Sequence, residues 1–238
     1  MEVVHNLLNY NNLKIVQNTS WFNFSLDSVI LAHFVDLKKS KVVLDLCTGN
    51  APIPIMISAK HNVKVVGIEI QKEIYDLALK SIKMNNLEDK IKLINDDVKN
   101  ITKIFPNESI DTITCNPPFF KVCDTSKLNG DKIKSIARHE ILINLNDIFK
   151  VAKVVLKNGG NIAIVHRSER LCDIITFMRV NSIEPKKVQF VYPKENTNSN
   201  IVLVEGIKNG NPGLKILSPI FAHNSDGEYS EIIKNMFE

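Results

Sequence analysis

Four consecutive residues near the middle of this 238-residue chain, Asn116-Pro117-Pro118-Phe119, have the types and spacing to hold a planar amine. They directly follow residues 110–115, a β-branched run that is typical of a buried strand. Two prolines in succession fix φ twice, so the Asn116 side-chain oxygen and the Pro117 carbonyl can point outward as two fixed acceptors. An exocyclic amino group has two N–H donors to match them. Phe119 adds a flat apolar face for a planar ring.

The same four residues could form only a rigid loop, so the elements that position them have to be considered. The expected strands cover residues 42–47, 63–68, 91–94, 110–115, 161–165, 186–192 and 200–208. The expected helices cover 27–38, 52–60, 72–85, 144–156 and 169–181, with a short helix after Asp97. This alternation predicts an α/β fold, a doubly wound and mostly parallel seven-stranded sheet that ends in an antiparallel C-terminal hairpin. Ligands of such sheets bind at the carboxyl ends of the strands.

Three strand ends carry residues suited to an adenosine-containing cofactor. The first strand leads into Asp45-Leu46-Cys47-Thr48-Gly49-Asn50-Ala51-Pro52, where Gly49 lets a ligand approach the main chain and Pro52 suits a first helical turn. The second strand ends at Glu69, which is placed to accept both hydroxyls of a ribose. The third runs into Asp96 and Asp97, either of which could meet an adenine amine. We favour Asp97 because Val98 and a helix start follow it.

The composition of the first turn distinguishes between adenosine cofactors. A dinucleotide fold usually carries G-x-G-x-x-G to cradle a pyrophosphate, whereas this turn has only Gly49. Without a phosphate cradle, and with Asp45 adding negative charge, the turn favours S-adenosylmethionine over NAD, because the sulfonium and ammonium groups of S-adenosylmethionine are cationic. The glycine turn and the two acidic strand ends are followed by a fourth strand that ends in Asn116-Pro117-Pro118-Phe119. Together these four strand ends predict a methyltransferase.

The segment 43–50, the strand end at Glu69 and the motif at 116–119 resemble class I S-adenosylmethionine-dependent methyltransferases of the amino-methylating group, whose motif is Asn or Asp followed by Pro-Pro and Tyr or Phe. Within this group the chain is similar, over nearly its whole length, to the bacterial tRNA(Val) adenine-N6 methyltransferases, which modify the adenine 3′ of the anticodon. The segments that carry this closer likeness are Gln17 with 22–28, 137–140, 166–171, 200–205, 213–216 and 229–230. In one departure, Ala51 replaces a glycine of the family, and we expect a slightly tighter cofactor pocket.

The resemblance implies a Rossmann-like methyltransferase domain over residues 41–238, preceded by an extension, 1–40, that packs on the domain and helps close the cofactor site. The implied catalytic residues are Asn116, Pro117, Pro118 and Phe119. The implied cofactor-binding residues are Phe24, Asp27, Asp45, Cys47, Thr48, Gly49, Asn50, Glu69, Ile70, Asp97, Val98 and Asn116. The implied substrate-binding residues are Phe119, Lys121, Arg138, Arg167 and Arg170. Residues 121–138 contain five basic and two acidic side chains, which suits either a substrate lid or a solvated loop.

Composition sets the remaining expectations. A net charge of +4 permits a polyanionic partner such as tRNA without requiring one. The four cysteines have no C-x-x-C pairing and no histidine at zinc spacing, so we expect reduced thiols and no metal. We also expect no membrane span, a cytoplasmic location and a monomer. The alternatives keep the fold but change the substrate to guanine N2 or an adenine in RNA, a DNA adenine or a protein glutamine, or leave a catalytically silent RNA-binding module.

Overall fold

The computed structural model describes residues 1–7, 12–21, 25–119 and 142–237. Its main sheet has the order β10-β8-β9-β7-β6-β3-β4-β5, with β11 also paired to β8. The strands are β3 (Val42–Leu46), β4 (Lys64–Ile68), β5 (Ile91–Ile94), β6 (Ile110–Cys115), β7 (Leu156–Arg167), β8 (Ile183–Tyr192), β9 (Ile201–Lys208), β10 (Lys215–Ile216) and β11 (Ile220–Phe221). Strands β3 to β7 pair in parallel, whereas β9 is antiparallel to both β7 and β8. The predicted Rossmann-like sheet with its C-terminal hairpin is therefore confirmed, but the two-residue strands β10 and β11 extend the seven predicted strands to a nine-stranded sheet.

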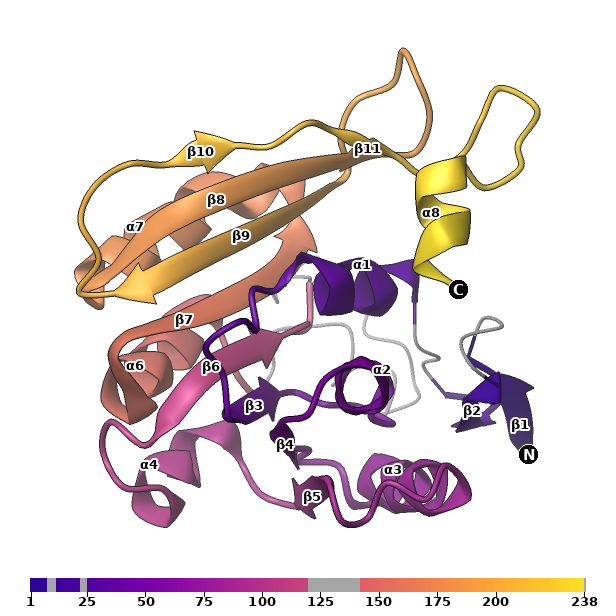
Figure 1. Ribbon diagram of the computed structural model, residues 1–238, viewed down its shortest axis with the longest axis horizontal. Helices are drawn as coiled ribbons and strands as arrows, with labels where there is room; N and C mark the ends of the chain where they lie inside the picture. The colour runs from indigo at the N-terminus through magenta and orange to yellow at the C-terminus, as the bar shows by residue number, and fades with distance from the viewer. Residues whose placement is uncertain (8–11, 22–24, 120–141, 238) are drawn as a thin grey trace.

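Helices cover both faces of this sheet, as Figure 1 shows. One face carries α1 (Leu26–Phe34), α2 (Pro52–Lys60) and α3 (Lys72–Met84). The other carries α4 (Ile101–Ile104), α6 (Leu145–Val155) and α7 (Leu171–Val180), with the short 3₁₀ turns η2 (Val98–Asn100) and η3 (Ser168–Arg170) beside them. Strand β7 shows the sequence basis of the two layers. Ala163 and Val165 pack in the α1–α3 layer, whereas Ile162 and Ile164 pack in the opposite layer, as the twofold side-chain period of a strand requires.

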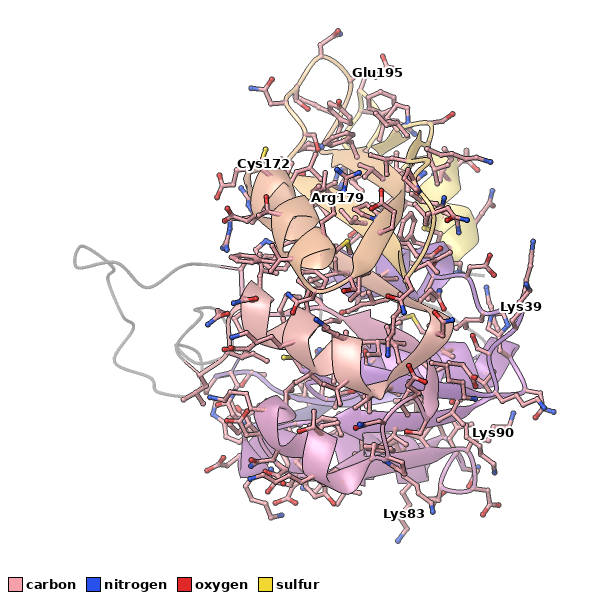
Figure 2. All side chains as sticks on the ribbon, turned by 90° about the vertical axis from the view of Figure 1, so that its left-hand side faces the viewer. Lys39, Lys83, Lys90, Cys172, Arg179 and Glu195 are labelled. Atoms are coloured by element: carbon pink, nitrogen blue, oxygen red, sulfur yellow. The ribbon has the colours of Figure 1, made fainter. Side chains whose placement is uncertain are left out.

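The helices follow from their apolar spacing and their end residues. In α3, the side chains of Ile74, Leu77, Ala78 and Ile82 are buried, which is the one-sided spacing of a surface helix. Helix α6 begins after Asn144, whose side chain accepts a hydrogen bond from the Asp147 backbone N–H at 3.0 Å. Figure 2 shows the outer face of α7, where Cys172 and Arg179 project from the helix.

Three terminal elements differ from the sequence-based expectation. Residues 1–40 contain an antiparallel hairpin, β1 (Glu2–Asn6) and β2 (Lys14–Asn18), that the polar sequence did not indicate. Helix α1 ends at Phe34 and not near Lys38, because Val35 already has an extended backbone. A short helix α8 (Glu231–Met236) lies near α1 at the C-terminal end of the described chain.

The hairpin is attached to the main domain along the outer edge of β2. The Val16 N–H donates to Ser81 Oγ on α3 at 2.9 Å, and the Val16 carbonyl accepts from Asn50 Nδ2 at 3.0 Å. At the other end of β2, the Lys14 N–H donates to Asn85 Oδ1 at 2.9 Å. The N-terminal strands therefore connect α3 with the turn that follows β3. Across the described ranges, helix length and hydropathy identify no candidate membrane span.

Candidate active site

A cavity lies at the carboxyl ends of β3, β4, β5 and β6, where the strand-end rule places a ligand. The structure brings nine of the predicted cofactor residues together in its wall: Cys47, Thr48, Gly49, Asn50, Glu69, Ile70, Asp97, Val98 and Asn116. Pro118 of the predicted catalytic motif lines the same cavity, and so does Ser28 of α1. One pocket thus joins the predicted cofactor turn to the predicted amine-binding motif.

The turn after β3 has an unusual backbone. Cys47, Gly49 and Ala51 have φ angles of 58°, 58° and 69°, so the chain passes through the left-handed region three times within five residues. A Cβ built on Gly49 would meet no atom within 4 Å, which leaves room for a ligand against the main chain. Ala51 is fully buried in the α1–α3 layer and does not line the cavity. The expectation that Ala51 tightens the pocket is therefore wrong, because its methyl group points into the core.

Asp45 is buried beneath this turn and is not part of the cavity wall. Its two carboxylate oxygens accept hydrogen bonds from Thr48 Oγ1 at 2.5 Å and from Thr114 Oγ1 at 2.6 Å. Burial raises the pKa of Asp45 to about 7, against the effect of the two hydroxyl donors. Asp45 thus connects the turn after β3 to strand β6, which leads into Asn116. It supports the cavity wall from the core side without lining it.

Glu69 stands in the wall itself, with only 6% of its surface exposed. Its Oε2 accepts from the Gly49 N–H and its Oε1 accepts from the Gln71 N–H, both at 2.9 Å. Burial raises the pKa of Glu69 to about 7, and the backbone donors oppose this rise. A carboxylate fixed in this way beside an open glycine turn fits the paired hydroxyls of a ribose.

The structure distinguishes between the two aspartates after β5. Asp97 lines the cavity and accepts a hydrogen bond from the Lys99 N–H, which makes it the N-terminal cap of η2. Asp96 does not line the cavity. It accepts from Asn100 Nδ2 at 2.8 Å and from the Asp97 N–H at 2.7 Å. Of the two aspartates, Asp97 is therefore the one that lies in the cavity wall.

The predicted catalytic motif leaves β6 at the edge of the cavity. Asn116 Nδ2 donates to Ser28 Oγ at 3.0 Å, which leaves Oδ1 as the amide atom that can accept a hydrogen bond from a ligand. Phe119 is half-buried, and its ring centroid lies 5.1 Å from that of His166 at a tilt of 41°. Sequence reasoning missed both Ser28 and His166. Ser28 comes from α1 and His166 from the end of β7. Both lie in the segments 22–28 and 166–171 that carry the resemblance, but no site role was assigned to either side chain.

The remaining predicted residues lie elsewhere or outside the described chain. Asp27 accepts a hydrogen bond from Ser25 Oγ at 2.8 Å and faces the charge of Arg167; it does not line the cavity. Arg170 is buried and pairs with Asp173 at 2.8 Å, whereas Arg167 is partly exposed at the end of β7. Phe24, Lys121 and Arg138 fall outside the described residues. Within the described ranges, no three His, Cys, Asp or Glu side chains are arranged to hold a metal ion.

Curated relatives match most of the chain. A protein from Parabacteroides distasonis is 25% identical over 181 residues, which cover 75% of this chain and 74% of the relative. One from Aliivibrio salmonicida is 23% identical over 211 residues and covers 88% and 87%. Both carry the name tRNA1(Val) (adenine(37)-N6)-methyltransferase.

Solved structures show the same fold at low identity. A predicted O-methyltransferase from Agrobacterium tumefaciens superposes with a TM-score of 0.71 at 17% identity, covering 89% of this chain and 95% of its own. TYW2 from P. horikoshii, solved in complex with MeSAdo, gives a TM-score of 0.60 at 17% identity, with 88% and 72% coverage. The model of the methyltransferase small domain matches residues 20–184, which include the cofactor turn, Glu69, Asp97 and the Asn-Pro-Pro-Phe motif. The chain therefore belongs to the methyltransferase small domain family, and its cofactor is S-adenosylmethionine.

Proposed function

We propose that this protein transfers a methyl group from S-adenosylmethionine to the exocyclic N6 amine of an adenine in tRNA, the one next to the anticodon of tRNA(Val). The observation that carries the proposal is the position of Asn116. Its amide stands in the same cavity wall as Glu69 and Asp97, and Ser28 holds the amide nitrogen. An acceptor for an amine thus shares one pocket with the carboxylates suited to a nucleoside cofactor.

The protein's own groups would act mainly by positioning. The lone pair of an adenine amine is delocalised into the ring, which makes the nitrogen a poor nucleophile. Asn116 Oδ1 and the Pro117 carbonyl would accept its two N–H bonds and let the nitrogen pyramidalise, while Phe119 replaces the stacking that the base loses outside its helix. Bound S-adenosylmethionine supplies the electrophilic methyl group. Glu69 would hold its ribose and Asp97 its adenine, so that the methyl group faces the amine.

The substrate rests on the relatives. Those named tRNA1(Val) (adenine(37)-N6)-methyltransferase match up to 89% of the chain at 21–29% identity. Phe119 in the motif favours a nucleobase over a glutamine side chain, since its ring offers a stacking face. The net charge of +4 suits tRNA as a partner, and we expect a monomer that acts where tRNA is found, in the cytoplasm.

The extension over residues 1–40 belongs to this proposal as a support for the cofactor site of the domain 41–238. Two of its contacts reach the cavity wall directly. Val16 accepts from Asn50, and Ser28 accepts from Asn116. These contacts support the expectation that the extension helps to close the site.

The product identifies the substrate most directly. The protein is incubated with labelled S-adenosylmethionine and unmodified total tRNA, and the methylated nucleoside is identified by mass spectrometry after digestion. We expect N6-methyladenosine in tRNA(Val). N2-methylguanosine would retain the amine chemistry but reject the substrate, and no label in RNA would direct the search to DNA or protein substrates.

Asn116→Ala tests the chemistry. Loss of the amide acceptor should lower kcat by about 100-fold or more, in the range found when one transition-state hydrogen-bond partner is removed. Affinity for S-adenosylhomocysteine, measured by calorimetry, should stay within about threefold, because Glu69 and Asp97 remain in place. A variant that keeps near-normal turnover would contradict the mechanism.

A further inference from the structure

His166 is placed beside the amine-binding motif by the topology of the sheet. Strands β6 and β7 are parallel neighbours, with Cys115 opposite Ile164, so the residues that follow each strand emerge side by side (Figure 1). Asn116 to Phe119 follow β6, and His166 lies at the end of β7. The imidazole contacts the Phe119 ring at a centroid distance of 5.1 Å, and none of its surface is exposed.

The hydrogen bonds of His166 fix the position of its proton. Nδ1 accepts from the Arg167 backbone N–H at 2.8 Å, so in the neutral ring the proton is on Nε2. The ring is neutral because burial lowers the pKa of His166 to about 3. Of the charged groups that face it, Arg170 and Arg167 lower the pKa further and Asp173 raises it. His166 therefore presents one uncharged N–H donor.

This donor is left without an acceptor in the described part of the chain. His166 Nε2 is buried and makes no hydrogen bond there, an arrangement shared with Gln17 Nε2 and Ser58 Oγ. Buried donors in folded proteins are nearly always paired, and an unpaired one is costly. Of these three atoms, only His166 Nε2 belongs to a side chain whose ring contacts the Asn-Pro-Pro-Phe motif. A ligand that brought an acceptor to this point would satisfy the donor.

We propose that the Nε2–H of His166 donates a hydrogen bond to a ring nitrogen of the target adenine, N1 or N7, which flank the amine. The proposal rests on the proposed function, because Asn116 and Phe119 must hold the base beside the imidazole. The Phe119 ring packs against the imidazole, and we expect it to turn toward the base as the base stacks, which would give the base access to the donor. His166 is then a specificity-determining residue that requires a purine nitrogen, in addition to the amine that Asn116 selects.

The test removes the donor and the acceptor separately and together. Wild type and His166→Phe are compared on tRNA whose target adenosine is unchanged or replaced by 1-deaza-, 3-deaza- or 7-deazaadenosine, and kcat/KM is measured for each. Phenylalanine keeps a ring against Phe119 but lacks the N–H. With one of the two substrates, 1-deaza or 7-deaza, kcat/KM of the wild type should fall about tenfold more than kcat/KM of His166→Phe, each relative to unmodified tRNA. The 3-deaza substrate should show no such coupling.

The possible outcomes separate the proposal from the proposed function. The role of His166 would be overturned if each deaza substrate lowered kcat/KM equally in wild type and His166→Phe, or if only the 3-deaza substrate distinguished the two proteins. Either result would leave adenine methylation intact. If wild type methylates no adenine, the proposed function itself fails. Melting temperature and S-adenosylhomocysteine affinity check that His166→Phe is folded, and His166→Leu serves as a second variant. If neither variant folds, a wild type that is insensitive to all three deaza substrates still overturns the proposal.

Discussion

At the scale of single residues, we expect Glu69 to make cofactor binding depend on pH. Its pKa is raised to about 7 by burial, and a ribose can donate two hydrogen bonds only to its ionised form. Affinity for S-adenosylhomocysteine should therefore fall about tenfold between pH 8 and pH 6, with a proton released on binding at the lower pH. Calorimetry in buffers of different ionisation enthalpy measures both quantities.

Glu69→Gln is the control for this pH dependence. The variant should bind S-adenosylhomocysteine more weakly at pH 8, and its affinity should change little between pH 8 and pH 6. Asp45, whose pKa is also raised to about 7, is outside the cavity wall and should not sustain the pH dependence. An unchanged dependence of affinity on pH would exclude Glu69 as its source.

The raised pKa of Glu69 also affects folding stability. Because the folded state binds this proton more tightly, the contribution of Glu69 to stability decreases as pH rises from about 4.5 to 7.

The residues that sequence reasoning found and missed differ in a physical respect. Glu69 and Asn116 directly follow β4 and β6, and Asp97 comes shortly after β5, so the rule that parallel strands end at one edge of the sheet is enough to bring them together. Ser28 reaches the site through tertiary packing of α1, 88 residues along the chain from its contact Asn116. His166 directly follows the predicted strand 161–165, so the same rule applies to it, but its burial and its contact with Phe119 cannot be read from the sequence. Asp45 shows the converse limit, because its sequence position does not reveal that its carboxylate turns inward to two threonines.

At the scale of elements, the cofactor turn depends on close contact between β3 and β4. Asp45 pairs with Gly67 in register, and a Cβ on Gly67 would lie 2.8 Å from Thr48 Oγ1 and 2.7 Å from Leu93 Cδ2. Gly67→Ala should thus displace Thr48 from Asp45, lower the free energy of unfolding by about 1–3 kcal/mol and weaken S-adenosylhomocysteine binding about tenfold. Thermal unfolding and calorimetry measure the two effects.

Gly227→Ala is the matched control for that substitution. Gly227 has a φ of 89° and no atom within 4 Å of an added Cβ, and it does not line the cavity. The variant should lose about 1 kcal/mol to backbone strain and bind the cofactor product normally. If Gly67→Ala also bound S-adenosylhomocysteine normally, the position of Thr48 would not determine the shape of the cofactor turn after β3.

At the scale of the whole molecule, the alternating core was predictable and the N-terminal hairpin was not. Buried parallel strands read as apolar runs, and the predicted helix over 52–60 matches α2. Strand β1 is mostly exposed, so it lacks the alternation that identifies a half-buried strand. Its partner β2 is fixed by backbone bonds to Ser81, Asn50 and Asn85, which leave no periodic signal in the sequence.

These bonds predict that the hairpin and the cofactor stabilise each other. Ser81→Ala removes the acceptor for the Val16 N–H, so hydrogen exchange in β2 should accelerate and the free energy of unfolding should fall by about 1–2 kcal/mol. Because the Val16 carbonyl holds Asn50 in the cavity wall, S-adenosylhomocysteine affinity should fall about two- to fivefold.

Linkage requires the reverse effect, so bound S-adenosylhomocysteine should slow exchange in β2 of the wild type by a similar factor. Asn85→Ala is the control, since it loosens the Lys14 end of the same strand, and Asn85 does not line the cavity. If Asn85→Ala weakened binding as much as Ser81→Ala, general loss of stability would explain the effect. If neither variant changed binding, the hairpin would be a separate covering of α3, and the cofactor turn would owe its shape to Asp45, Gly67 and Glu69 alone.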